Sequence, residues 1–447
     1  MMDDYEFASH LADAEHPISD RKNVPHVLIS GGGLGGLMLA LLLEKAGISY
    51  LILERAKEVK SLGAVMALSA GVLGIFEQLQ LLEGLAGVSK PINDFKFFSS
   101  ELKSIGHLMG KDEKDQTGYE RMVFSRPELH DLLLAKIPAE KIHLSKKVVS
   151  MIQDDDAVAV RCQDKSVYVA DLLVGADGAY SGVRQSMYAR LDRDNLLPEC
   201  DKRSLNKGYF CLVGTTDGLD PAKFPQLRKT YSDASLMISD NSPHSWSTFS
   251  VPGDRVCWSL VIQLTAKESE EEQFRNSEWG PAANKSMINS VAHFKTPYGT
   301  LGELINATPK DTISRLLPST GQGCVNAVQD AVVLANCLYD MMTTSIEDVT
   351  QALDDYREQR FEHVKTQYEA SQWNAKIIYG HTFLDRLLRQ GTLHLLPKSV
   401  HRNISVKDAK YRPQVAFLPQ APERGALPAL PQKPSRRYTE EQQALAV

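Results

Sequence analysis

The sequence predicts an α/β protein, in which a Rossmann-type dinucleotide-binding domain carries an inserted antiparallel sheet and is followed by helices. Two observations predict the first domain: a short buried strand at 26–30, and a glycine-rich turn that leads into a helix at 34–46. The aromatic and β-branched composition of the strands within 200–265 favours an antiparallel sheet. The charged, periodic segment 346–379 predicts a long C-terminal helix.

The composition is that of a globular protein with more than one domain. The chain has 447 residues, of which 43% are hydrophobic and 24% charged, so it can form a large core and wholesale disorder is excluded. Its 50 basic and 56 acidic residues give a net charge of −6. This mild negative charge offers no reason to expect a nucleic acid or an anionic membrane as partner.

Cysteine spacing and the N-terminal segment indicate a reducing, cytoplasmic environment. None of the 6 cysteines forms a Cys-x-x-Cys pair, so neither a metal site nor a disulfide framework is expected. Residues 1–24 are acidic and polar, which argues against a secretory signal, and glycines interrupt the longest uncharged run at 27–43. An integral membrane segment is therefore not expected. For the apolar stretch 383–396, peripheral membrane contact remains an alternative to packing against the body or a partner subunit.

The first elements form one β-α-β unit. Consecutive apolar residues at 26–30 predict a strand that is covered on both faces. The following helix at 34–46 ends at Gly47, where a left-handed cap belongs, and a second buried strand follows at 50–53. A right-handed crossover between two parallel strands follows from this order.

The turn inside this unit carries the chemistry. Gly31-x-Gly33-x-x-Gly36 lies between strand and helix, and Glu54 ends the second strand. The first glycine permits a tight turn, the second lets the backbone approach a pyrophosphate, and the third lets helix and strand pack closely. The free N–H groups of the helix favour phosphate, and Glu54 is placed to accept hydrogen bonds from ribose hydroxyls. The pattern predicts an adenine dinucleotide.

Further along, helices and alternating strands are expected in turn. A helix is expected at 69–82, and another begins at Ser125, which with Glu128 matches a capping box. Alternation over 147–171 predicts antiparallel strands. Beyond Arg412 repeated prolines and few apolar residues predict a disordered tail.

Two later glycine motifs allow two interpretations each. Asp177 and Gly178 follow a buried strand at 171–174, where they either orient an extended cofactor or simply cap the next helix. The segment 318–323 precedes a helix, where its N–H groups either lie beside a flavin ring or form an ordinary helix entry. The histidines, His130 included, show no ligand spacing and are expected at the surface or in the core.

Together these motifs resemble the flavoprotein monooxygenases of the para-hydroxybenzoate hydroxylase type, particularly the fungal FAD-dependent members, over residues 24–360. The resemblance implies that Arg126 lies near the FAD pyrophosphate. It also implies that Asp177 and Gly178 take part in FAD and NAD(P)H binding. The positions carried over as cofactor-binding are Gly31, Gly33, Leu34, Gly35, Gly36, Glu54, Arg55, Gly63, Ala64, Arg126, Asp177, Gly178, Gly321, Gln322 and Gly323.

The activity implied by the resemblance is monooxygenation. NAD(P)H, as a transient co-substrate, would reduce FAD, and O2 would form a flavin C4a-hydroperoxide that hydroxylates or epoxidises a small aromatic or polycyclic substrate. No catalytic side chain is assigned. The alternatives are an FAD-dependent reductase or dehydrogenase on the same fold, or a catalytically impaired isoform.

The sequence departs from the family before Pro318. The family has a buried strand ending in Gly-Asp there, whereas only Lys-Asp-Thr-Ile-Ser-Arg-Leu-Leu stands between Pro309 and Pro318. Asp311 is the only nearby carboxylate, and the family role is not carried over to it. A deletion relative to the family follows, either as a gene-model artefact or as a real loss of activity.

The expected organisation is a discontinuous FAD-binding domain with an inserted substrate domain. The expected boundaries are a disordered leader at 1–23, the FAD-binding domain at 24–88, 126–199 and 306–345, the substrate domain at 89–125 and 200–305, C-terminal helices at 346–400, and a disordered Pro-rich tail at 401–447.

Overall fold

The computed structural model describes residues 25–58, 65–109, 112–154, 157–202, 208–239, 241–265, 285–316, 322–380, 382–392 and 409–445. Its helices are α2 (Leu34–Ala46), α3 (Ala70–Gln78), α4 (Leu82–Gly87), α5 (Asp112–Thr117), α6 (Arg126–Leu134), α7 (Gly182–Arg193), α9 (Lys285–Val291), α10 (Leu301–Asn306), α11 (Gln322–Tyr339), α12 (Ile346–Tyr379), α13 (Phe383–Gln390) and α15 (Arg436–Leu445). Its main strands are β1 (His26–Ser30), β2 (Ser49–Leu53), β3 (Val65–Leu68), β4 (Ser89–Pro91), β5 (Asp94–Ser99), β6 (Ser104–Met109), β7 (Met122–Ser125), β8 (Ile142–His143), β9 (Val148–Gln153), β10 (Val158–Cys162), β11 (Val167–Ala170), β12 (Leu172–Gly175), β13 (Tyr209–Thr215), β14 (Ala234–Ile238), β15 (His244–Val251), β16 (Arg255–Gln263) and β19 (Ser314–Leu316).

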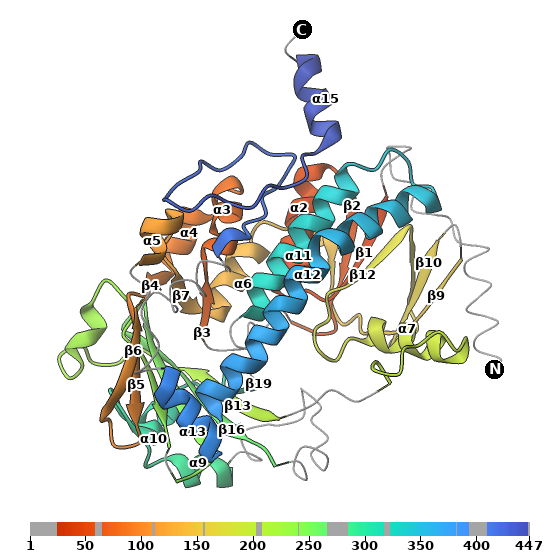
Figure 1. The fold of residues 1–447 in the computed structure, drawn as a ribbon. Helices are drawn as coiled ribbons and strands as arrows, with labels where there is room; N and C mark the ends of the chain where they lie inside the picture. The colour runs from red at the N-terminus through yellow and green to blue at the C-terminus, as the bar shows by residue number, and fades with distance from the viewer. Residues whose placement is uncertain are drawn as a thin grey trace.

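A parallel sheet of order β12-β1-β2-β8 forms the centre of the dinucleotide-binding unit (Figure 1). β1 pairs in parallel with both β2 and β12, which confirms the β-α-β unit expected from the sequence. Val27, Leu28 and Ile29 are fully buried, because the sheet is covered on both faces. Helix α2 ends at Gly47 in the left-handed conformation (φ 68°), as predicted.

Different layers cover the two faces of this sheet. On one face α2 lies between the sheet and α11, and its residues are buried on nearly all sides, as its continuous apolar sequence requires. On the other face the antiparallel strands β9, β10 and β11 pack against β1 and β2 through Leu28, Leu53, Val160 and Cys162. The α/β class expected from the sequence is confirmed.

A second sheet, of order β19-β13-β16-β15-β14-β5-β6, lies in the lower part of Figure 1. Its pairs are antiparallel, as expected for 200–265, except that β14 and β5 run parallel. β19 pairs with β13, so residues 314–316 belong to this sheet and not to the dinucleotide-binding unit to which 306–345 was assigned. The reason is that β13 offers a free antiparallel edge to this short segment.

The predicted capping box at the start of α6 is wrong. Ser125 is the N-cap residue but makes no side-chain cap bond, and its Oγ lies 3.4 Å from the Thr215 Oγ1 of β13. Glu128 instead accepts a hydrogen bond from the Arg255 guanidinium of β16 at 2.5 Å. Both side chains bind polar groups of the second sheet, and they therefore connect the start of α6 to that sheet.

The expectation of a disordered Pro-rich tail is wrong for residues 409–445, which cross the helical layer of the dinucleotide-binding unit. The Gln78 amide accepts from the Val415 N–H at 2.8 Å and donates to the Val415 carbonyl at 3.1 Å. The Asn336 amide accepts from the Ala416 N–H at 2.8 Å and donates to the Gln414 carbonyl at 2.9 Å. Prolines remove backbone donors from this segment, and side-chain amides of α3 and α11 satisfy several groups that remain.

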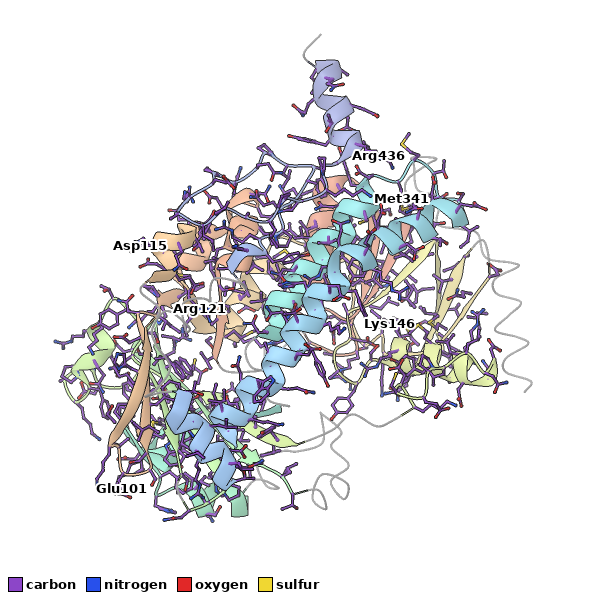
Figure 2. The ribbon with its side chains drawn as sticks, in the orientation of Figure 1. Glu101, Asp115, Arg121, Lys146, Met341 and Arg436 are labelled. Carbon is purple, nitrogen blue, oxygen red and sulfur yellow. The ribbon has the colours of Figure 1, made fainter. Side chains whose placement is uncertain are left out.

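The start of α15 is held at the C-terminus of α11, and α15 extends away from the body (Figure 1). Asp340 accepts hydrogen bonds from the Ser435 hydroxyl at 2.5 Å and from the Arg436 N–H at 3.2 Å. Met341 and Arg436, labelled in Figure 2, mark this junction. Within the described residues, no helix is both long and apolar enough to span a membrane.

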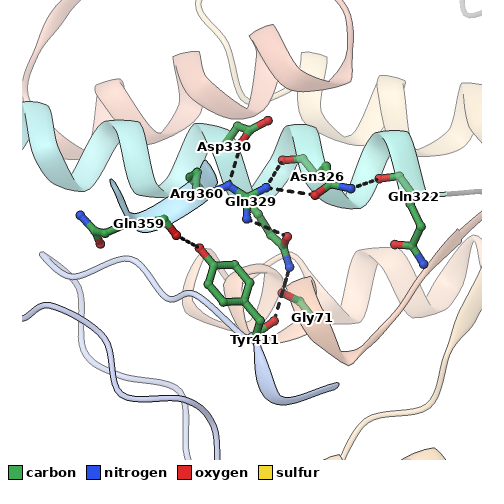
Figure 3. A network of polar contacts seen from close by, with 8 residues as sticks. All are labelled: Gly71, Gln322, Asn326, Gln329, Asp330, Gln359, Arg360 and Tyr411. Atoms are coloured by element: carbon green, nitrogen blue, oxygen red, sulfur yellow. Dashed lines mark hydrogen bonds and ion pairs between the residues drawn. The ribbon is translucent and has the colours of Figure 1, made fainter. Parts of the chain in front are cut away.

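A buried arginine joins α11 and α12 (Figure 3). Arg360 of α12 is 2% exposed, and its guanidinium donates to Asp330 at 2.7 Å, Gln329 at 3.2 Å and the Asn326 side chain at 3.1 Å. Asn326 in turn donates to the Gln322 carbonyl at 3.1 Å, which orders the first turn of α11. A planar, permanently charged donor is suited to such a junction.

Replacing Phe417 by alanine should destabilise the protein markedly. Phe417 is buried and stacks on Tyr339 with 4.6 Å between ring centroids, so its removal should cost about 3–5 kcal/mol. The free energy of unfolding from a urea titration measures this. Leu430→Ala, at an exposed position of the same segment, is the control and should change little. Equal stability of the two variants would show that residues 409–445 do not pack as described.

Stability should fall as the pH decreases from about 6.5 to about 4, in part because of His363. Burial, and next the nearby Arg360 charge, lower the pKa of His363 to about 4, and its ring stacks on Tyr411. The unfolded chain therefore takes up the proton at higher pH than the folded protein, and folding stability is lost on acidification. His363→Gln should flatten this pH dependence of the unfolding free energy by on the order of 1 kcal/mol. The exposed control His107→Gln should leave it unchanged.

Candidate functional site

The loop after β1 requires glycine at two positions because two backbones meet there. A Cβ on Gly31, whose φ is +110°, would lie 2.6 Å from the Ala176 carbonyl oxygen beyond β12. A Cβ on Gly36 would lie 2.1 Å from the Gly31 carbonyl oxygen. The first turn of α2 therefore contacts the end of β1 directly, as the glycine spacing indicates.

Gly33 differs from these two, since it faces open space. It is the N-cap of α2 in an extended conformation, and no atom lies within 4 Å of a Cβ built on it. The amino end of α2 has no acidic side chain in its first turn to satisfy its free N–H groups. This end of the helix can therefore accept a phosphate group against the backbone.

Glu54 is fixed at the end of β2 by two backbone donors. Its Oε2 accepts from the Gly32 N–H at 2.7 Å and its Oε1 from the Ala56 N–H at 2.8 Å. The carboxylate is thus held against the glycine loop with further lone pairs for sugar hydroxyls. The neighbouring Arg55 is exposed, and Leu34 belongs to the core.

The two carboxylate oxygens of Asp177 lie in different environments. Its Oδ2 accepts from the Gly182 N–H, the first of α7, at 2.8 Å, whereas the N-cap itself is Ser181. Gly178 has the positive φ (+83°) of a turn residue. Its Oδ1 is buried and has no hydrogen-bond partner among the described residues. Since Gly31 packs on the Asp177 backbone, this free oxygen lies near the glycine loop.

Arg126 lies near the start of α11, and α11 packs on α2. Burial lowers the pKa of the Arg126 guanidinium, and the Cys324 thiol in the first turn of α11 is close enough to affect it. Burial also raises the pKa of Cys324 to about 12, so this thiol stays neutral. A Cβ on Gly35 would lie 3.2 Å from the Ala327 Cβ, which shows how closely α2 and α11 pack. Gln322 and Gly323 are the first two residues of α11.

Three of the expected site residues, Gly63, Ala64 and Gly321, lie outside the described residues. One contact of the glycine loop was not expected from the sequence. His130, expected as an ordinary surface or core histidine, is 3% exposed, and its Nε2 lies 2.9 Å from the Gly32 carbonyl oxygen. The sequence offers one indication of a place near the site: His130 lies four residues after Arg126, on the same face of α6.

The second sheet presents a mainly apolar face to this unit. Cys211, Val213, Val251, Cys257 and Val261 form one cluster with Val123 of β7. Hydroxyl groups interrupt the cluster: the Oγ atoms of Ser247 and Ser259 are 2.6 Å apart, and the Thr215 Oγ1 lies 3.3 Å from the Cys257 Sγ. Burial raises the pKa of Cys257 to about 11, which argues against a thiolate nucleophile.

Comparisons with known proteins agree with this geometry. Residues 25–195 match the family model described as FAD binding domain. The FAD-dependent monooxygenase ausM of Penicillium brasilianum is 25% identical over 436 residues, covering 90% of this chain and 88% of the relative. The FAD-dependent monooxygenase ptmM of Penicillium ochrochloron is 26% identical over 382 residues, covering 78% and 87%.

Solved structures show the same fold at low sequence identity. Klebsiella pneumoniae HpxO, complexed with FAD and uric acid, superposes with a TM-score of 0.69 at 19% identity, covering 87% of this chain and 97% of that one. The 2,6-dihydroxypyridine-3-hydroxylase of Arthrobacter nicotinovorans gives a TM-score of 0.61 at 14% identity, covering 82% and 95%.

Alanine at Gly33 and at Gly36 should have different effects. Gly33→Ala should preserve the unfolding free energy but weaken FAD binding about tenfold or more, because its methyl group enters the space left for a diphosphate. Gly36→Ala should lower the unfolding free energy of the apoprotein by about 1–3 kcal/mol, because its methyl group meets the Gly31 carbonyl. Urea denaturation and FAD fluorescence titration measure the two quantities. Unchanged FAD affinity in Gly33→Ala would place the diphosphate elsewhere.

Proposed function

Because the chain belongs to the FAD-dependent monooxygenases of the para-hydroxybenzoate hydroxylase type, we propose that it uses NAD(P)H and O2 to hydroxylate or epoxidise a small organic substrate. The observation that carries the proposal is that α6 contacts both the glycine loop and the second sheet. Arg126 begins this helix near Cys324 of α11, and His130 of the same helix contacts Gly32 of the glycine loop. Ser125 and Glu128 contact the second sheet. A cofactor on the loop would therefore lie close to the apolar face of that sheet.

The residues present fit the adenine and diphosphate half of FAD. We assign the diphosphate to the open side of Gly33 and to Arg126, and the ribose hydroxyls to Glu54. The unpartnered Asp177 Oδ1 would accept a hydrogen bond from the extended cofactor. When bound, FAD supplies hydride acceptance from NAD(P)H and the activation of O2, and the protein supplies binding, orientation and exclusion of water.

The face of the second sheet favours a neutral, ring-shaped substrate. Valine, cysteine and aromatic side chains dominate it, and they bury apolar surface without offering a counter-ion. The Ser247–Ser259 and Thr215 hydroxyls would orient a few polar groups of the substrate. A small aromatic or polycyclic compound has this combination of properties.

A second candidate function follows from the edge of the parallel sheet. Among the described residues β12 pairs only with β1, and β19 is paired with β13. Together with the missing Gly-Asp before Pro318, the unpaired edge favours a chain that lacks one strand of its family. An FAD-dependent reductase or dehydrogenase, or a catalytically impaired isoform, is the corresponding alternative. Sequencing the transcript across residues 314–318 tests for an omitted segment.

Purified protein mixed with FAD should retain the flavin, and NAD(P)H should bleach its visible absorbance in the absence of oxygen. With a panel of aromatic and polycyclic compounds, ¹⁸O2 should then place one labelled oxygen in a product, as detected by mass spectrometry. The matched control is Gly33→Ala, which should retain little flavin. Bleaching without incorporation of oxygen across the panel would favour the reductase, and the absence of bound flavin would contradict both enzyme functions.

A further inference from the structure

We propose that His130 is a positioning residue for the diphosphate of FAD, acting through the carbonyl of Gly32. This inference rests on the proposed function of the glycine loop. His130 and the loop lie 98 positions apart in the sequence, and α6 brings them together. His130 itself lies in α6, outside the glycine motif.

The contact has a defined direction. A carbonyl oxygen only accepts hydrogen bonds, so at 2.9 Å the His130 Nε2 must carry the hydrogen and donate to Gly32. In the neutral ring the Nδ1 is then unprotonated. It has no hydrogen-bond partner among the described residues, and the Asp131 carboxylate stands 3.9 Å away. The ring therefore makes one directed polar contact, and that contact is to the loop.

This contact fixes the orientation of one peptide plane. The described backbone contains no cis peptide bond, so the N–H of Gly33 points opposite to the carbonyl of Gly32. Because His130 draws the carbonyl toward α6, the Gly33 N–H is turned away from α6. Gly33 borders the open space at the amino end of α2, where a diphosphate would bind.

A second side chain holds the same residue from the other side. The Glu54 carboxylate accepts from the Gly32 N–H at 2.7 Å, so both backbone polar groups of Gly32 are bound by side chains. Without these contacts a glycine residue samples many conformations, and ligand binding must then restrict them. His130 is thus expected to lower the entropic cost of FAD binding.

Gln and Asn substitutions separate the hydrogen bond from the packing of the ring. The Gln amide reaches about as far as the His Nε2, whereas the Asn amide is too short to reach Gly32. His130→Gln should bind FAD within about twofold of the wild type, and His130→Asn about tenfold more weakly, as expected for one lost hydrogen bond. Fluorescence titration of the apoprotein with FAD, and with ADP as a diphosphate probe, measures both affinities.

The controls use neighbouring groups that do not touch the loop through their side chains. Asp131→Asn removes the adjacent exposed charge, and His143→Asn removes another ring, which contacts the Tyr168 hydroxyl at 3.0 Å. Both should bind FAD as the wild type does. Melting temperatures of the apoproteins, without FAD, report on packing alone and should agree for His130→Gln and His130→Asn.

The measured affinities separate failure of the role of His130 from failure of the proposed function. Equal FAD affinity of His130→Asn and the wild type would overturn the inference, and so would equal losses in the Gln and Asn variants together with lower melting temperatures. If the wild-type protein binds neither FAD nor ADP, it is the proposed function that fails.

Discussion

The close approach of Gly31 and Gly36 is the constraint on which the site depends. With 2.1 Å between the Gly31 carbonyl oxygen and the Cβ that any other residue would place at position 36, the first turn of α2 lies directly against the end of β1. This contact places the free N–H groups of the helix at the carboxyl edge of the parallel sheet. Glu54 and Asp177 meet them there, since each follows a neighbouring strand of the same sheet.

The elements that the sequence predicted well are those set by local interactions. The strand 26–30, the helix 34–46 and the left-handed Gly47 follow from hydrophobic pattern and backbone freedom, and the structure contains each of them. The capping box at Ser125 and Glu128 failed because side chains of the second sheet compete for both residues. Residues 409–445 were misjudged because their stability comes from Gln78 and Asn336, hundreds or tens of positions away, and composition does not contain that information.

The site itself was predictable only in part, for the same reason. Gly31, Gly36 and Glu54 have a fixed spacing that reflects a local backbone path, and the geometry around them matches it. The two interpretations of Asp177 could not be separated from sequence, because one carboxylate oxygen binds the first N–H of α7 while the other has no partner among the described residues. His130 has no spacing signal relative to Gly32, since their contact exists only after α6 packs beside α2. The assignment of these residues, and of Arg126, Gln322 and Gly323, to the cofactor is a proposal.

The pairing of α2 with α11 has a consequence for synthesis on the ribosome. Residues 47–321 separate the two helices, so the apolar outer surface of α2 leaves the exit tunnel long before α11 is made. Until α11 is made, that apolar surface lacks the layer that buries it in the finished protein. The contacts that join α3 to α11 through residues 409–445 form later still.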